Sequence, residues 1–179
     1  MDLKISLRSQ LFALKEMIVI SIVYFGLLYL LYLNTDIEGF KILFLGTFVF
    51  YFIIVLLPVV VLHINYLHNA YKDIKVEENK LTVNNKIMYT AMDINQINIY
   101  ATAQHINDVT GAFTPPYAMC YYYIEINLKS RKNIILSSLI DYKMDQIIKN
   151  KFKTIKIIEH PSTFAMLLIN KQKDENHEC

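Results

Sequence analysis

EENKLTVNNKIMYTAMDINQINIY, residues 77–100, decides the fold of the second half of this 179-residue chain. Apolar and polar side chains alternate along it, which is the period of a β-strand with one buried face. Asn84 and Asn85 interrupt the alternation, and asparagine tolerates the positive φ angles of a tight turn. The stretch therefore predicts a hairpin of soluble antiparallel sheet.

Two long uncharged runs precede this predicted sheet. They cover residues 17–33 and 42–62. A helix over the second run spans roughly 31 Å at ~1.5 Å per residue, which matches the hydrocarbon core of a bilayer. Only eight residues join the runs, and the remaining chain is too small to bury both helices. We therefore predict a transmembrane helical hairpin over residues 13–67.

The distribution of charge predicts how this hairpin is oriented. Lys4, Arg8 and Lys15 precede the first run, and Lys72 and Lys75 follow the second. The connecting segment carries two acidic residues and a single lysine. The positive-inside rule then places both termini in the cytoplasm. We expect a multi-pass protein of the cytoplasmic (inner) membrane.

The N-terminal segment, residues 1–12, has the pattern of an interfacial amphipathic helix. On a helical wheel Lys4, Arg8 and Lys15 fall within about 40° of each other at ~100° per residue, flanked by leucines. Such a helix lies flat on the bilayer with its basic side chains near anionic lipid. We predict that these three residues contact the lipid surface; an ordinary positive flank without lipid preference is the alternative.

The composition of the two runs favours an anchor over a pore. Neither run contains Asp, Glu, Lys, Arg, Asn or Gln. Transporters and channels need such groups at membrane depth to replace the hydration of the passing ion. A channel would require several copies of the chain, and a homo-oligomer stays open as an alternative.

The pattern after the hairpin predicts one domain over residues 68–153. A further strand is expected over residues 97–103, and a glycine with two prolines predicts a long loop over residues 107–119. Residues 121–128 alternate again, and a lysine-rich turn leads to another strand. The inward face of this alternation holds Tyr122, Ile124, Ile126 and Leu128.

The last part of the chain predicts a helix and a tail. Ile140, Met144, Ile147 and Ile148 form an amphipathic stripe, with Ser138 and Asp141 as its N-terminal capping pair. Residues 154–179 predict an extra strand, a short helix and a charged end.

Two stretches resemble bacterial pleckstrin-homology-like (PH-like) domains. IKVEENKLTVNNKIMYTAMDINQINIY (74–100) is similar to their opening strands, including the step Met92-Asp93-Ile94-Asn95-Gln96-Ile97. YYYIEINLKSRKNIILSSLIDYKMDQIIKNKF (121–152) is similar to their two closing strands and capping helix. Many members carry two membrane helices before the sheet, so the resemblance extends over residues 13–153. The tail after Phe152 and the long loop depart from it.

This resemblance implies an α+β membrane protein. Its transmembrane hairpin would be followed by an antiparallel PH-like β half-barrel with a C-terminal capping helix. The hairpin would hold the half-barrel against the cytoplasmic face of the membrane, where it presents a surface to a lipid or a protein.

The sequence contains no recognisable catalytic or metal-binding constellation. GxSxG, P-loop and HExxH motifs are absent, and Cys120 and Cys179 are nearly sixty residues apart. His63 and His68 lie about 140° apart on a helix, so they do not share a face. A net charge of +2 predicts no nucleic-acid partner. We expect no enzyme, no metal and no cofactor.

Two basic segments bear on lipid recognition. Some PH domains bind phosphoinositides with several basic residues at the first strand turn, but here that turn is Glu77-Glu78-Asn79-Lys80, which repels phosphate. Lys129, Arg131 and Lys132 in a later turn could contact an anionic bilayer without headgroup specificity. A solvated turn is the alternative.

An aromatic patch is the candidate surface for a protein partner. It would comprise Phe113, Tyr117, Tyr121 and Tyr123, because aromatic side chains dominate interface hot spots. The alternative is that these rings pack inside the domain. We expect a membrane-anchored, non-catalytic binding or scaffolding module; the alternative is an immunity protein that neutralises a membrane-targeting toxin.

Overall fold

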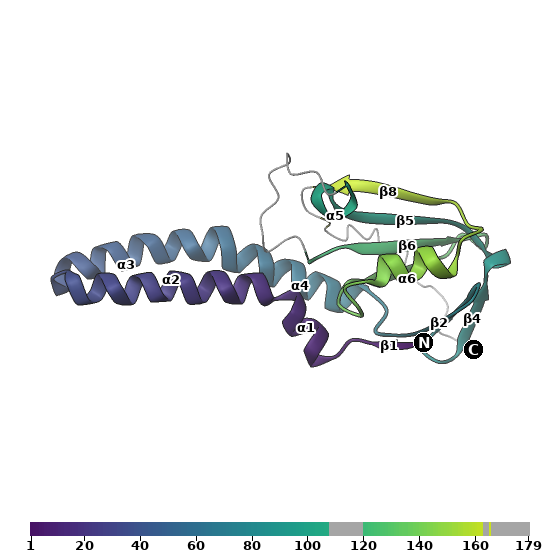
Figure 1. Ribbon diagram of the computed structural model, residues 1–179, viewed down its shortest axis with the longest axis horizontal. Helices are drawn as coiled ribbons and strands as arrows, with labels where there is room; N and C mark the ends of the chain where they lie inside the picture. Colours follow the sequence, from purple (N-terminus) through teal and green to yellow (C-terminus); the bar gives the residue numbers. More distant parts are fainter. Residues whose placement is uncertain (108–119, 163–164, 166–179) are drawn as a thin grey trace, which may run out of the picture.

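The computed structural model describes residues 1–107, 120–162 and 165. A long helical hairpin extends from one end of a domain rich in strands (Figure 1). We call this part the β domain; it holds the eight described strands and the helices α5 (Ala103–Asn107) and α6 (Met144–Lys151). The chain is therefore α+β, as its sequence predicted.

The hairpin consists of two apolar helices. The first is α2 (Lys15–Asn34), and the second combines α3 (Ile37–Tyr51), the π-helical turn η1 (Phe52–Leu56) and α4 (Leu57–Asn69). By length and composition both could cross a membrane, and few residues of either apolar stretch are buried inside the chain. Packing inside the chain therefore does not account for their apolar surfaces.

Aromatic and hydroxyl side chains hold the two helices together. Tyr24 stacks on Tyr51 with the ring centroids 4.5 Å apart, and the Tyr24 hydroxyl donates to Thr47 Oγ1 at 3.2 Å. Ser21 and Tyr51 share a further hydrogen bond. Close packing and hydrogen bonds of this kind are what associate apolar helices in lipid.

Pro58 accounts for the π-helical turn in the second helix. Proline has no backbone N–H, and its ring clashes with the carbonyl four residues before it. Ahead of it the helix widens, so that the N–H of Leu57 donates to the carbonyl of Phe52. The helix then continues past the proline as α4.

A short N-terminal strand makes the hairpin an insertion within the β domain. β1 (Asp2–Lys4) pairs antiparallel with β2 (Asp73–Glu77), and Leu3 is buried in the core. The Met1 ammonium donates to the Val76 carbonyl at 2.9 Å. The predicted helix over residues 1–12 is thus wrong at residues 2–4, because strand pairing buries Leu3. The helix α1 (Leu7–Ala13) begins after a Ser6 cap.

The first sheet has the order β1-β2-β3-β4, with β3 (Lys80–Val83) and β4 (Ile87–Thr90) joined by tight turns. Asn84 and Asn85 have φ angles of 51° and 54°, which confirms the predicted turn. Asn79 has a φ of 55° in the preceding turn between β2 and β3. Asparagine at these positions lowers the cost of left-handed backbone.

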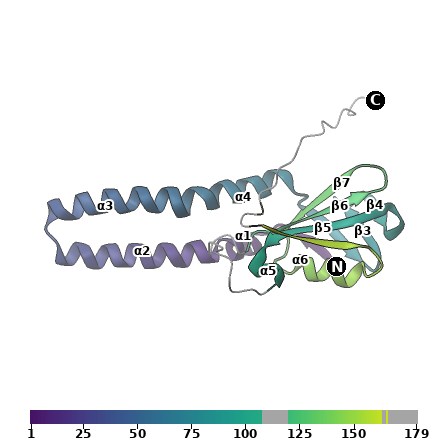
Figure 2. The ribbon, with the colours of Figure 1, turned by 90° about the horizontal axis from the view of Figure 1, so that it is seen from above.

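The second sheet has the order β7-β6-β5-β8. Its strands are β5 (Ile94–Thr102), β6 (Tyr123–Leu128), β7 (Asn133–Ser137) and β8 (Ile157–Ser162). The turn η2 (Ala91–Asp93) connects the two sheets, and β8 lies parallel to β5 at the edge (Figure 2). The extra strand that was predicted after residue 154 is β8, which begins at Ile157. The half-barrel stays a prediction.

Two predicted boundaries differ from the structure. Ala103 begins α5 instead of ending the strand, since β5 stops at Thr102. The helix α6 begins at Met144, and its N-cap is Lys143, so Ser138 and Asp141 do not form the predicted capping pair. Leu139 and Ile140 are buried in the turn before the helix, and this burial delays the helix start.

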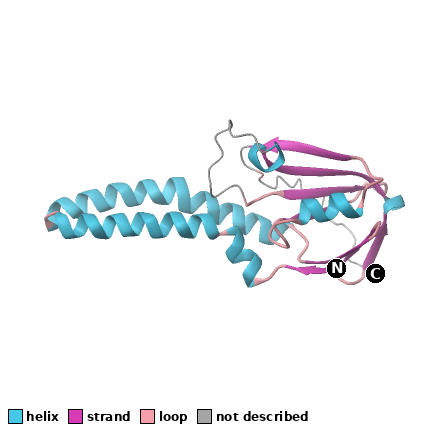
Figure 3. Ribbon diagram, in the orientation of Figure 1, coloured by secondary structure: helices cyan, strands magenta, loops and turns pink. Residues whose placement is uncertain are grey.

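One core joins the two sheets and α6. It takes Ile74 and Leu81 from the first sheet, Ile99 and Ile124 from the second and Ile148 from α6. The predicted inward face of β6 is buried: Tyr122, Ile124, Ile126 and Leu128. Figure 3 shows α6 beside the strands, with the hairpin outside this core.

We expect Leu3→Ala to lower the free energy of unfolding by about 2–4 kcal/mol, because it removes a buried side chain from the core and leaves a cavity. Leu7→Ala is the matched control, since Leu7 is 73% exposed; it should change stability by less than about 0.5 kcal/mol. Thermal unfolding of the full chain in detergent, followed by circular dichroism, measures both. Equal effects would contradict the role of β1.

Candidate functional site

The hairpin and the β domain meet in a second core cluster. Its buried members are Ala13, Val59, Leu62, Tyr66, Tyr121 and Leu139. The Tyr121 ring packs edge-on against Tyr66 with the centroids 5.5 Å apart. Residues of α1, α4 and the segment before β6 therefore share one apolar interior.

A short polar relay crosses the same junction. The Tyr121 hydroxyl lies 2.9 Å from His63 Nδ1, and His63 Nε2 lies 3.3 Å from Gln10 Oε1. Because the Gln10 oxygen can only accept, the neutral imidazole carries its proton on Nε2 and accepts from Tyr121. Tyr66 also donates a short hydrogen bond to the carbonyl of Ala165, which ties the chain after β8 to α4. The junction is thus fastened by directional bonds as well as by packing.

These positions revise the predicted aromatic patch. Tyr121 is fully buried, so its predicted place on an exposed patch is wrong and the packing alternative holds for this ring. Tyr123 is half-buried and stacks on Tyr100, with the centroids 4.7 Å apart. Phe113 and Tyr117 lie outside the described residues. Partner binding by Phe113, Tyr117 and Tyr123 stays a prediction.

Burial also keeps these tyrosines protonated. Desolvation raises the pKa of Tyr121 above its ordinary range, and desolvation together with Tyr100 and Glu125 raises the pKa of Tyr123 to about 12. A tyrosine hydroxyl is already protonated near pH 7, and these shifts keep both hydroxyls protonated at higher pH than an exposed tyrosine, so neither can serve as a base near pH 7.

The outer face of the second sheet carries an ordered polar network. The Glu125 carboxylate accepts from Asn133 at 2.8 Å, from Asn98 at 3.3 Å and from Tyr100 at 3.4 Å. Tyr100 also stacks on His160 of β8, with the centroids 4.6 Å apart. No pattern in the sequence indicated that these side chains contact each other. These contacts link β8 to β5 and β6 on this face of the sheet.

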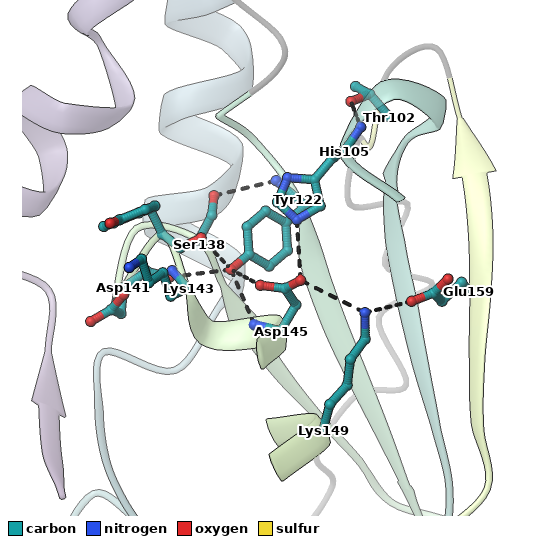
Figure 4. Close-up of polar contacts among 10 residues, drawn as sticks. Thr102, His105, Tyr122, Ser138, Asp141, Lys143, Asp145, Lys149 and Glu159 are labelled. Carbon is teal, nitrogen blue, oxygen red and sulfur yellow. Dashed lines mark hydrogen bonds and ion pairs between the residues drawn. The ribbon is translucent and has the colours of Figure 1, made fainter. Parts of the chain in front are cut away.

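A buried carboxylate organises the opposite side of this sheet (Figure 4). Asp145 on α6 is 6% exposed, and its Oδ1 accepts from the Tyr122 hydroxyl at 3.2 Å. His105 Nε2 lies 3.3 Å from Asp145 Oδ2 but lacks hydrogen-bond geometry, so this contact is an ion pair when the imidazole is protonated. Lys149 Nζ lies 3.8 Å from the same oxygen and also pairs with Glu159 on β8. The carboxylate thereby connects α5, α6, β6 and β8.

The surroundings of Asp145 favour its charged form. Burial alone would raise its pKa, but the contact with His105, the backbone N–H of Gln146 and the charge of Lys149 outweigh burial and lower it. Only the i,i+4 spacing of Asp145 and Lys149 was visible in the sequence. Within the described part of the chain no group of three or more His, Cys, Asp or Glu side chains could hold a metal ion. The contacts of Asp145 therefore have a structural role: they hold α5, α6 and β8 together.

Comparison with known families identifies the β domain. A family model described as "PH domain" matches residues 3–149, which run from within β1 through the hairpin into α6. This chain belongs to the PH domain family. Searches of curated proteins and of solved structures give no match. PH domains are typically non-catalytic binding modules, so the family supports binding and gives no indication of enzymatic activity.

The basic residues that were predicted to contact lipid lie at opposite ends of the PH domain. Lys129, Arg131 and Lys132 form the turn between β6 and β7, whereas β6 begins beside α4, where Tyr123 contacts Tyr66. Five residue steps along β6 at ~3.4 Å place this turn roughly 17 Å further out. Figures 1 and 2 both show that end of the domain pointing away from the hairpin. The turn does not reach the level of the hairpin base.

The other three predicted lipid contacts stay near the hairpin. Lys4 lies on β1, Arg8 on α1 and Lys15 is the first residue of α2; all three are exposed. They do not form the predicted single helical stripe, because Lys4 belongs to a strand. Their contact with lipid stays a prediction.

We expect Asp145→Asn to reduce stability at neutral pH and to flatten its dependence on acid pH. Because the folded pKa of Asp145 is lowered, the carboxylate contributes stability above its unfolded pKa and loses it as pH falls through the folded value. Thermal midpoints between pH 7 and pH 3 should therefore fall more steeply for the wild type than for the variant. The loss at pH 7 should be on the order of 1–3 kcal/mol.

The control for this experiment is Asp36→Asn, which keeps an oxygen to cap α3. It removes a carboxylate charge while leaving the contacts of Asp145 unchanged, so an effect confined to Asp145→Asn is assigned to Asp145. If the thermal midpoint of Asp145→Asn falls with pH as steeply as that of the wild type, Asp145 is not the cause of this pH dependence.

Proposed function

We propose that this chain is a membrane-anchored, non-catalytic binding module. The hairpin spans the bilayer twice, with the PH domain and both termini on the cytoplasmic side, and the domain presents its far end to a protein partner. The observation that carries the proposal is the low burial of two long apolar helices that are inserted within a PH domain. Lipid is the environment that covers such surfaces.

The connectivity supports the orientation. β1 and β2 are neighbouring strands, and the Ile5 N–H donates to the Lys72 carbonyl at 3.0 Å, so the chain leaves the domain and returns to it at one place. Two spans connected in this way return the chain to the side from which it left. The basic residues at that side and the acidic tip at Asp36 and Glu38 agree with the positive-inside rule.

A cysteine-labelling experiment tests the anchor. Asp36→Cys should react with a membrane-impermeant thiol reagent in intact cells, whereas Asn150→Cys, an exposed position on α6, should react only after the membrane is opened. Native Cys120 and Cys179 are changed to Ser in both chains. Labelling of position 150 in intact cells would overturn the orientation, and release of the protein by alkaline carbonate would overturn the anchor.

The far end of the PH domain offers a surface for the partner. Six large apolar or aromatic side chains are exposed among the described residues of the domain: Met1, Tyr71, Ile87, Met88, Met92 and Tyr142. Three of these lie on β4 and η2, at an edge of the first sheet. The Lys129 N–H donates to the Asp93 carbonyl, so the basic turn lies beside them. An extended partner segment with apolar and acidic side chains would fit this edge.

We expect a photo-crosslinking residue at Met88 or Met92 to capture one common protein in native membranes. The same residue at Asn150 is the control, and it should not capture that protein. Changing Lys129, Arg131 and Lys132 to Gln should reduce the yield at both sites, because an acidic partner loses charge complementarity. Equal capture from all three sites would contradict a partner surface on β4.

A further inference from the structure

Two aromatic rings and two lysines meet at the base of the hairpin. Phe12, near the end of α1, packs on Tyr142, which precedes α6, with ring centroids 4.4 Å apart. Lys15 Nζ lies 4.4 Å from the centre of the Phe12 ring, and Lys143 Nζ lies 5.3 Å from the centre of the Tyr142 ring. Together with Arg8, we call these residues the base patch. The patch joins the membrane-proximal helices to the PH domain across about 130 residues of sequence.

The base patch is positively charged and open to solvent. Arg8, Lys15, Tyr142 and Lys143 are exposed. Glu16 lies 3.6 Å from Lys15, but an ion pair this exposed binds its lysine weakly. Asp141 directs Oδ1 to the backbone N–H of Lys143 at 2.8 Å. The three cations Arg8, Lys15 and Lys143 therefore outnumber the two neighbouring carboxylates, and the Asp141 carboxylate already accepts a backbone hydrogen bond.

The patch lies where the polar and apolar surfaces of the chain meet. The uncharged run of α2 begins directly after Lys15 and Glu16. On α1, Leu7 and Leu11 are four residues apart on one helix face and are 73% and 50% exposed. Aromatic rings with basic side chains at such a boundary are typical of the headgroup layer.

Lys143 occupies a position that its own helix disfavours. It is the N-cap of α6, where Ser, Thr, Asp or Asn would accept a backbone hydrogen bond, and no side-chain cap is formed. Its charge also adds to the positive end of the helix dipole. A residue that is unfavourable for its own helix indicates that it serves an interaction outside the helix. For Lys143 that interaction would be with an anion.

We propose that the base patch binds the headgroup of an anionic glycerophospholipid, with Lys15 and Lys143 contacting the phosphodiester and Leu7 and Leu11 lying against the acyl chains. Arg8 contributes charge at its rim, and the Phe12–Tyr142 pair holds the two lysines in place. This inference rests on the proposed membrane anchor. The site differs from the turn between β2 and β3, where Glu77 and Glu78 repel phosphate.

The test counts lipid molecules that stay bound to the full-length protein in detergent, by native mass spectrometry. Phosphatidylglycerol is the anionic probe and phosphatidylcholine the neutral one. The wild type should retain phosphatidylglycerol in preference to phosphatidylcholine. The double variant Lys15→Gln, Lys143→Gln should bind phosphatidylglycerol roughly tenfold more weakly, because each substitution removes an attraction to the anionic lipid. The matched control, Lys86→Gln with Lys153→Gln, removes two exposed lysines outside the patch and should bind it like the wild type.

Each remaining outcome decides the question. Equal retention of the two lipids by the wild type, or an equal loss in both double variants, would overturn the base patch. Competition by glycerophosphoglycerol without acyl chains at the same concentration would overturn the lipid assignment in favour of a soluble phosphate. Alkaline extraction of the same variants from membranes reports separately on the anchor, so a failed site and a failed anchor are distinguishable.

Discussion

The pairing of β1 with β2 is the interaction on which the rest of the structure depends. Three residues at the N-terminus enter the edge of the first sheet, bury Leu3 and direct the Met1 ammonium to Val76. This pairing holds both ends of a 33-residue helix and its partner at one place on the domain. Without this pairing, only the end of the hairpin that leads into β2 would be attached to the sheet. With it, both ends of the hairpin are fixed to neighbouring strands.

The junction around Tyr121 adds rigidity to that attachment. The ring is buried between α4 and the turn before α6, and its hydroxyl continues through His63 to Gln10 on α1. Buried aromatic rings with satisfied hydroxyls stabilise a packed interior. The PH domain therefore has a fixed direction relative to the hairpin.

The charged side chains follow the same division. Asp145, His105 and Lys149 are used inside the domain to connect α5, α6 and β8, and Glu125 orders the outer face of the sheet. A buried carboxylate persists in such a place because its neighbours compensate for lost hydration. Other basic residues stay exposed, among them those at the hairpin base and in the turn between β6 and β7.

The order and type of most elements were readable from the sequence alone, because they arise from local patterns. The two uncharged runs became the two long helices, the Asn84-Asn85 turn has positive φ angles, and the inward face of β6 is the predicted one. Only tertiary structure decided that residues 2–4 form a strand, that β8 runs parallel to β5, and that Tyr121 is buried while Phe12 meets Tyr142. Periodicity records which face of an element is buried. It holds no information on which distant segment covers that face, since such contacts depend on the path of the whole chain.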